Sequence, residues 1–177
     1  MRTVIIVESH YGATAGVAEE LARVARRHGD VEVVRVEDAG PDAVDGADLV
    51  LVGGPTHVHG MTWSSTRRTA DADAAGRQGR EPGIDAAGPG LRTWFHQVDR
   101  VHGTPSAAFD TRLDGPEHLT GRASLGISRR LRHHGFVEVA APRSFLVDKE
   151  NALLEGELGR AADWADSVFG SMPAVVH

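Results

Sequence analysis

A short polar loop near the start of the chain has the composition of an anion-binding turn. It reads Ser9-His10-Tyr11-Gly12-Ala13-Thr14. Ser9, Tyr11 and Thr14 carry hydroxyls, and Gly12 lets the backbone approach a ligand closely. The residues that follow predict a helix, whose first N–H groups and positive dipole end would point at the same place. The loop suits a phosphate even without Lys or Arg, because hydrogen bonds to a charged acceptor are strong. A turn in which Ser9 and Thr14 only cap the helix explains the residues equally well.

A second candidate loop begins with Gly53-Gly54-Pro55 and continues as Thr56-His57-Val58-His59-Gly60-Met61-Thr62-Trp63. Its rings and thioether are suited to wall a flat heterocycle, whose polar rim would meet backbone amides. The alternative is a rigid turn with incidental histidines. We expect no metal site at His57 and His59, because two histidines without a nearby carboxylate or Cys supply too few ligands.

A third candidate loop reads Phe109-Asp110-Thr111-Arg112-Leu113-Asp114-Gly115. Its polar groups offer contacts to the other side of the same ligand, or they form a simple capped turn.

Alternating strands and helices would bring these loops together. Thr3 to Val7 is continuously apolar and β-branched, which predicts a strand buried on both faces of a parallel sheet. Val17, Leu21 and Val24 then recur at helical spacing. Further strands are predicted over 31–36, 48–52, 104–109 and 137–147, and Pro142 interrupts the last of them. Further helices are predicted over 91–98 and 119–131. The last helix is predicted from a stripe of apolar residues at helical spacing: Leu154, Leu158, Ala161, Ala165 and Val168. This order predicts a doubly wound α/β fold, in which ligands bind at the carboxyl ends of the strands.

Composition narrows the function classes. The 177 residues fit one domain, 1–177, with a mobile surface excursion or an irregular helix expected over 64–90. Cys is absent, so redox chemistry would need a bound cofactor. The net charge of −6 argues against nucleic acid and suits partners with basic docking surfaces. No apolar stretch is long enough for a signal peptide or a membrane span, which predicts a cytoplasmic protein.

Other classes on α/β folds lack their motifs here. The first loop has only Gly12 of a dinucleotide-binding G-x-G-x-x-G, and Lys149, the single lysine, lies in no phosphate-binding Walker loop. The expected third strand ends in Gly53-Gly54-Pro55, where a phosphoacceptor domain needs Asp. Ser124 lies in Arg-Ala-Ser-Leu-Gly on an expected helix, so a nucleophile elbow is also absent.

In this order the three loops resemble those of the flavodoxin family, and the resemblance extends over essentially the whole chain. Ser9, Gly12 and Thr14 match the family's Thr/Ser-x-Thr-Gly-x-Thr phosphate loop, with Tyr11 in place of the middle Thr. The Tyr-Gly-x-Thr form and the segment from Pro55 to Gly60 look like the quinone-reductase relatives of flavodoxin. The resemblance implies a three-layer α/β sandwich with a five-stranded parallel sheet in the order 2-1-3-4-5.

The resemblance also implies a cofactor, flavin mononucleotide (FMN), and a role in electron transfer with a redox partner protein. The cofactor would perform the chemistry, while the fold sets its potential and access. Backbone amides of the first loop would hold the phosphate, Thr56 to Gly60 would contact the flavin edge, and Asp110 to Arg112 would line the pyrimidine side. The implied contacts are Ser9, His10, Tyr11, Gly12, Ala13, Thr14, Pro55, Thr56, His57, Val58, His59, Gly60, Phe109, Asp110, Thr111 and Arg112.

Three functions remain open from the sequence. The first is an FMN electron carrier, the second an FMN-dependent NAD(P)H:quinone-type oxidoreductase, and the third a flavodoxin-fold scaffold without cofactor. Flavodoxin carriers usually stack the flavin between a Trp and a Tyr, whereas the single Tyr here is Tyr11 in the first loop. His57, His59, Trp63 or Phe109 would have to take that place.

Overall fold

Parallel strands form the centre of the structure, a computed structural model that describes residues 1–56 and 90–173. Their order is β2-β1-β3-β4-β5, and β6 also pairs with β4. Every pairing between these strands is parallel. The strand bounds are β1 Arg2–Val7, β2 Asp30–Arg35, β3 Leu49–Pro55, β4 Pro105–Leu113, β5 Val137–Glu138 and β6 Arg143–Val147. The predicted order 2-1-3-4-5 is therefore confirmed.

The fifth predicted strand is divided into two pieces. β5 pairs with the beginning of β4 and β6 with its end, in the same direction. The two pieces flank Pro142, which has no N–H to donate to a sheet ladder. One predicted strand thus accounts for both β5 and β6.

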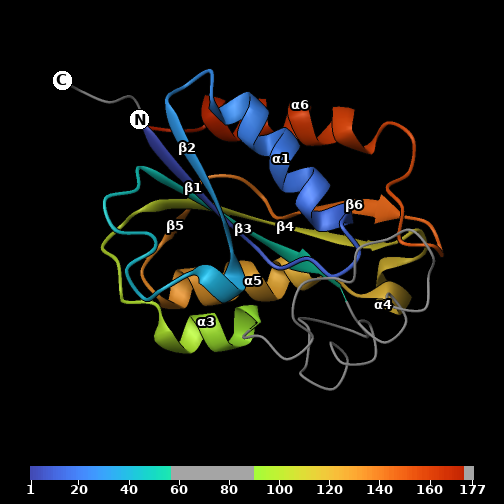
Figure 1. The fold of residues 1–177 in the computed structure, drawn as a ribbon, viewed down its shortest axis with the longest axis horizontal. Helices are drawn as coiled ribbons and strands as arrows, with labels where there is room; N and C mark the ends of the chain where they lie inside the picture. Colours follow the sequence, from blue (N-terminus) through green and yellow to red (C-terminus); the bar gives the residue numbers. More distant parts are fainter. Residues whose placement is uncertain (57–89, 174–177) are drawn as a thin grey trace.

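Helices cover both faces of the sheet (Figure 1). α1 and α6 lie side by side on one face, and α3 and α5 lie on the other. The helix bounds are α1 Ala13–Ala25, α3 Leu91–Gln97, α4 Glu117–Thr120, α5 Ala123–His133 and α6 Glu157–Gly170, with a short 3₁₀ turn η1 at Val36–Asp38. The three layers of the predicted α/β sandwich are present.

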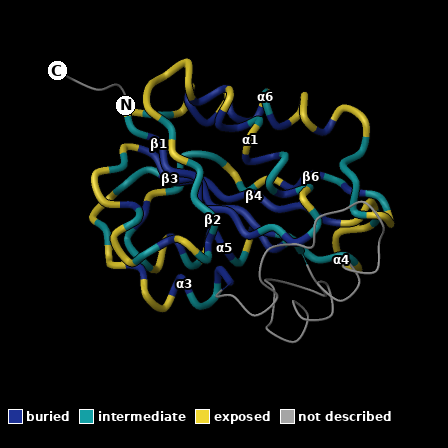
Figure 2. The backbone as a smooth tube through the Cα atoms, in the orientation of Figure 1, coloured by how far each residue is buried: buried dark blue, intermediate teal, exposed yellow. Residues whose placement is uncertain are grey.

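Alternate residues of the central strands face two separate cores, so the strands are buried along their length (Figure 2). Ile5 and Leu51 pack toward α1 and α6. Ile6 and Val52 pack toward α3 and α5. This explains why β1 and β3 read as continuous apolar runs, since a strand covered on both faces needs apolar residues at every position.

The prediction that residues 109–115 form a loop is wrong for residues 109–113. Phe109 to Leu113 continue β4, and all except Leu113 are buried. Polar residues within this stretch have partners on neighbouring elements, described below, and this permits their burial.

Two helix predictions also need correction. The predicted helix over 119–131 divides at Gly121, which has a φ of 76° and separates α4 from α5. In the last helix, Leu154 precedes α6 and Leu158 is exposed. Trp164 and Phe169 complete the buried face instead, because large rings reach the core from positions beside the stripe of small residues.

Candidate functional site

A pocket of about 220 Å³ lies where β1, β3, β4 and β6 end. It brings together the first loop, the end of β3 and the end of β4, as the winding of the sheet predicts. The lining residues are His10, Tyr11, Ala13, Thr14, Pro55, Thr56, Thr111, Arg112, Leu113, Val147 and Asn151.

The start of α1 is open toward this pocket. Gly12 has a φ of 91°, and an added Cβ there would have no heavy atom within 4 Å. The Oγ of Ser9 accepts a hydrogen bond from the N–H of Ala15 at 3.2 Å and so satisfies one donor of the first turn, while the N-cap residue itself is Gly12. The N–H groups of Ala13 and Thr14 have no acceptor within the helix, since the first turn of any helix lacks them. Both residues line the pocket, which therefore has the donor set that an anion requires.

Threonines that line the pocket form hydrogen bonds that connect α1, β3, β4 and α5. Thr14 Oγ1 and Thr111 Oγ1 lie 2.7 Å apart and are buried. Thr56 donates its N–H to the carbonyl of Thr111 at 2.8 Å. Its Oγ1 accepts the N–H of Ala123, the first residue of α5, at 2.9 Å. The end of β3 is thereby fixed both to β4 and to α5.

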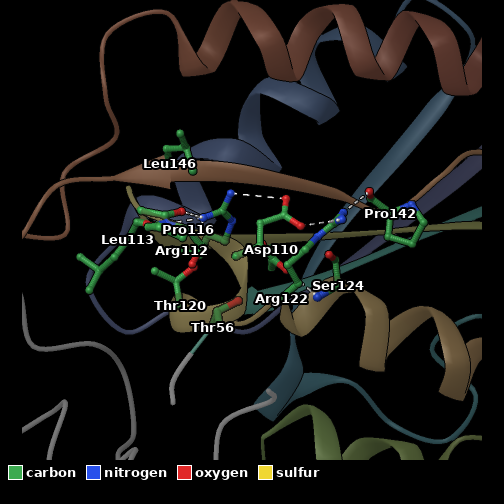
Figure 3. Close-up of polar contacts among 12 residues, drawn as sticks. Thr56, Asp110, Arg112, Leu113, Pro116, Thr120, Arg122, Ser124, Pro142 and Leu146 are labelled. Carbon is green, nitrogen blue, oxygen red and sulfur yellow. Dashed lines mark hydrogen bonds and ion pairs between the residues drawn. The ribbon is translucent and has the colours of Figure 1, made fainter. Parts of the chain in front are cut away.

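Asp110 and Phe109 lie away from the pocket, although both are in the predicted contact set. Asp110 is fully buried, and its Oδ2 accepts the N–H of Ser124 in the first turn of α5 at 2.6 Å (Figure 3). Burial raises the pKa of Asp110 above its ordinary value, against the hydrogen bond from Ser124 and the positive charge of Arg122, which lower it. Phe109 is fully buried and meets Trp164 edge to face.

Arg112 is the one Arg or Lys among the described residues that line the pocket, and it comes from β4 rather than from the first loop. One of its terminal nitrogens donates to the carbonyls of Leu113 at 3.3 Å and Gly115 at 2.8 Å, and to Thr120 Oγ1 at 3.1 Å (Figure 3). The other lies 3.5 Å from Glu117. These bonds hold the guanidinium at the pocket edge and tie β4 to α4.

A buried carboxylate connects the first loop with α3. Glu8 Oε2 accepts the N–H of Leu91 at 2.9 Å, and its Oε1 lies 3.3 Å from Nε2 of His10. The side chains of Glu8 and His10 are 5% and 3% exposed. The sequence singled out His10 but gave no role to Glu8. Of the predicted contacts, His57, Val58, His59 and Gly60 lie outside the described residues, as do Trp63 and nearly all of 64–90.

The comparisons with known proteins agree with this geometry. Residues 4–66 match the family model of the flavodoxin domain. Flavodoxin 1 of Bacillus cereus superposes with a TM-score of 0.66 at 15% identity, over 96% of this chain and 98% of its own. The flavodoxin of Megasphaera elsdenii gives 0.55 at 22% identity, over 93% and 98%. Rubredoxin oxygen:oxidoreductase of Desulfovibrio gigas gives 0.59 at 17% identity, over 98% of this chain and 37% of its own. Comparison with curated protein sequences gives no match.

The chain has a flavodoxin-like fold.

Three residues that line this pocket were not among the contacts predicted from the sequence. Leu113 and Val147 end β4 and β6, and Asn151 lies in the loop that follows. Asn151 has a φ of 60°, a left-handed conformation in which Asn is enriched. Asp148 supports the turn, since its Oδ1 accepts the N–H groups of Glu150 and Ala152. The polar run after the fifth predicted strand was the available signal, because that strand ends at the same edge of the sheet.

Within 1–56 and 90–173, the flavodoxin-like structure contains no cluster of three or more His, Cys, Asp or Glu side chains arranged to bind a metal ion. Of the helices in those ranges, none has the length and apolar character required to span a bilayer.

Proposed function

We propose that this chain binds FMN at the carboxyl edge of its sheet and transfers electrons to or from a redox partner protein. The observation that carries the proposal is the pocket itself, which unites residues of three predicted contact segments beside an unobstructed helix start. The flavodoxin-domain match over residues 4–66 supports it. The similar structures include an oxidised flavodoxin and a two-electron-reduced flavodoxin.

The residues of the pocket fit the phosphate end of FMN. Ala13 and Thr14 would donate their N–H groups, and Gly12 leaves space for the phosphate where any other residue would project a side chain. Arg112 adds a positive charge to the lining of the same pocket. The volume of about 220 Å³ lies below the roughly 300–1,000 Å³ of pockets that enclose a whole small molecule. The pocket therefore suits the phosphate end of FMN. In this proposal the flavin ring is contacted by Thr56 to Gly60.

FMN would supply the electron exchange, and the protein would supply binding and access. Thr56 and Asp110 would act indirectly, because they fix β3 and β4 to the start of α5. We include in the proposal that residues 1–177 form one domain and that the protein acts in the cytoplasm.

Flavin titration tests this function. The purified protein, stripped of any flavin, is titrated with FMN and with riboflavin, which lacks the phosphate, and flavin fluorescence is followed. We expect FMN to bind at least about 100-fold more tightly, because charge-assisted hydrogen bonds each contribute about 1.5–3 kcal/mol. Absence of FMN binding would overturn the proposal and would favour the alternative of a flavodoxin-fold scaffold without cofactor.

Two glycine substitutions sharpen the test. Gly12→Ala adds a methyl group between the pocket-lining residues Tyr11 and Ala13, and Gly156→Ala adds one at the start of α6, which contributes no residue to the pocket lining. Both glycines have a positive φ and open space around them, so the backbone strain is matched. We expect FMN affinity to fall about tenfold or more for Gly12→Ala, since one misplaced contact costs about 1.4 kcal/mol or more, and to stay within about twofold for Gly156→Ala.

A reductase is distinguished from a carrier with the loaded protein. Slow reduction by NAD(P)H alone, together with rapid reduction by an added flavodoxin reductase, supports the carrier. Rapid bleaching of the flavin by NAD(P)H without a helper enzyme would replace it with the NAD(P)H:quinone-type oxidoreductase.

A further inference from the structure

A buried carboxylate lies next to the lining of the candidate phosphate pocket. Glu8 directly follows β1, and its N–H donates to the carbonyl of Gly53 at 2.9 Å, so the ladder between β1 and β3 extends to this residue. Its side chain is 5% exposed. The carboxylate is therefore held by the strand ends that also position the pocket.

The two oxygens of this carboxylate contact different elements. Oε2 accepts the N–H of Leu91, the first residue of α3, at 2.9 Å. Oε1 lies 3.3 Å from Nε2 of His10, whose side chain is 3% exposed. Of the two members of this pair, His10 lines the pocket. An anion that enters the pocket therefore meets His10, with a carboxylate in contact with that imidazole.

The charge of the Glu8–His10 pair depends on one proton. With a neutral imidazole the pair carries one negative charge, which repels a phosphate. With an imidazolium the pair is neutral, and its positive member faces the anion. Histidine is the side chain that changes charge between about pH 5 and 8, so this proton can be gained near neutral pH. Phosphate binding and protonation of His10 should therefore favour each other.

The other charged groups near His10 act in both directions. Arg112 from β4 and Tyr11 are the remaining lining residues that can carry charge, and the guanidinium opposes a second positive charge. Arg92, directly after Leu91 on α3, acts in the same sense. The first turn of α1 contains no acidic residue.

Carboxylates act in the opposite direction. Among the described residues, Glu8 is the carboxylate within ion-pair distance of His10. Asp110 on β4 is buried as well, but its Oδ2 is bound to the N–H of Ser124. Glu8 and the incoming phosphate are thus the charges that favour the imidazolium most directly.

We propose that His10 takes up a proton from solvent when the phosphate of FMN binds, with Glu8 as the positioning residue that favours this proton. The inference rests on the proposed FMN site and deepens it. The loop after β1 contains no Lys or Arg. The imidazolium of His10 would supply the cation of that loop, and it would turn the Glu8–His10 pair from a repelling charge into a neutral one.

Calorimetry of the flavin-free full chain measures this proton. FMN is added at pH 8, where its phosphate has already lost its second proton, in two buffers of different ionisation enthalpy. We expect uptake of about one proton with FMN and none with riboflavin, because histidine alone among these groups gains a proton there. Absence of FMN binding would remove this inference together with the proposed function. FMN binding without proton uptake, or equal uptake with riboflavin, would contradict this inference alone.

His10→Gln should abolish the proton uptake. It should also weaken FMN binding about tenfold or more at pH 8, because the negative charge of Glu8 then stays uncompensated beside the phosphate. His102→Gln is the control, since His102 is exposed and does not line this pocket. It should keep the proton uptake and an affinity within about twofold of the wild type. Proton uptake that persists in His10→Gln would assign the proton to another group.

Glu8→Gln separates charge from structure. Glutamine keeps an oxygen for the N–H of Leu91 but removes the negative charge. Alone it should reduce the proton uptake, since the imidazolium loses its partner. Added to His10→Gln, it should restore about tenfold in FMN affinity, because the repelling charge is then gone. A further loss of affinity in the double variant would mean that Glu8 serves the site only by holding α3.

Discussion

The hydroxyls of Thr14 and Thr111 lie 2.7 Å apart, although 97 positions separate them in the sequence. Thr14 is in the first turn of α1, and Thr111 is near the end of β4. This hydrogen bond joins two segments that both line the candidate FMN pocket. The polar side chains at this helix start and this strand end can be buried because each hydroxyl has the other as its hydrogen-bond partner.

Thr111→Val should destabilise the protein by about 1–3 kcal/mol, because it leaves the buried Thr14 hydroxyl without its partner. Thr14→Val/Thr111→Val should cost less than the sum of the two single changes, since both polar groups are then removed. Urea denaturation of the flavin-free protein measures all three free energies. Strict additivity would show that the bond contributes nothing to stability.

The spacing of apolar residues correctly predicted the strands and helices whose buried residues follow a regular pattern in the sequence. The run from Thr3 to Val7 became β1, and Val17, Leu21 and Val24 became the buried stripe of α1. Asp110 was assigned to a loop because the fourth strand was predicted to end at Phe109, whereas Asp110 is buried within β4, where an isolated carboxylate would be costly. Its partner, the N–H of Ser124, belongs to a helix start that only the tertiary structure brings near.

The site, too, was predicted where the local sequence pattern is sufficient and missed where tertiary structure decides. The winding rule identified the loops after β1 and β3, and residues from both line the pocket. Val147 and Asn151 were missed although the fifth strand was correctly predicted to end at Val147, because only the loops after the first, third and fourth strands were taken as candidates. Knowledge of sequence position alone could not show that Phe109 turns into the core, against Trp164.

Asp110→Asn should change how stability depends on pH. The pKa of Asp110 is raised above its ordinary value of 3.8, chiefly by burial, so the folded state binds this proton more tightly than the unfolded state. The resulting stabilisation is complete below the unfolded pKa and is lost as pH rises through the folded pKa. Asn keeps an oxygen for the N–H of Ser124 but does not titrate. Its stability relative to the wild type should therefore increase as pH rises through that range.

Denaturation midpoints across acidic and neutral pH provide this measurement. Asp114→Asn, the same substitution at an exposed position, serves as the control. A loss of stability in Asp110→Asn at neutral pH would mean that the charge itself is required to cap α5.

Gly53→Ala should destabilise the protein by about 1–3 kcal/mol, the usual cost of overpacking. An added Cβ would overlap the ring of Phe109, which is fully buried and held against Trp164. Gly159→Ala on α6 meets no atom within 4 Å, and it should instead stabilise by about 0.5–1 kcal/mol because Ala favours helix. Thermal melts of both variants test the pair. Midpoints that move in the same direction would refute this explanation of the small residue in β3.

Arg112→Lys should lower stability by about 1–3 kcal/mol and weaken FMN binding as well. One terminal nitrogen of the guanidinium donates to two carbonyls and to Thr120 while the other lies near Glu117, whereas lysine has a single ammonium nitrogen and cannot serve both sides. Glu117→Gln is the matched control, because the Glu117 side chain is 55% exposed and such ion pairs contribute only about 0–1 kcal/mol. Chemical denaturation and FMN titration of both variants are compared with the wild type. If Arg112→Lys proves as mild as Glu117→Gln, the bonds to Gly115 and Thr120 do not hold this edge of the pocket.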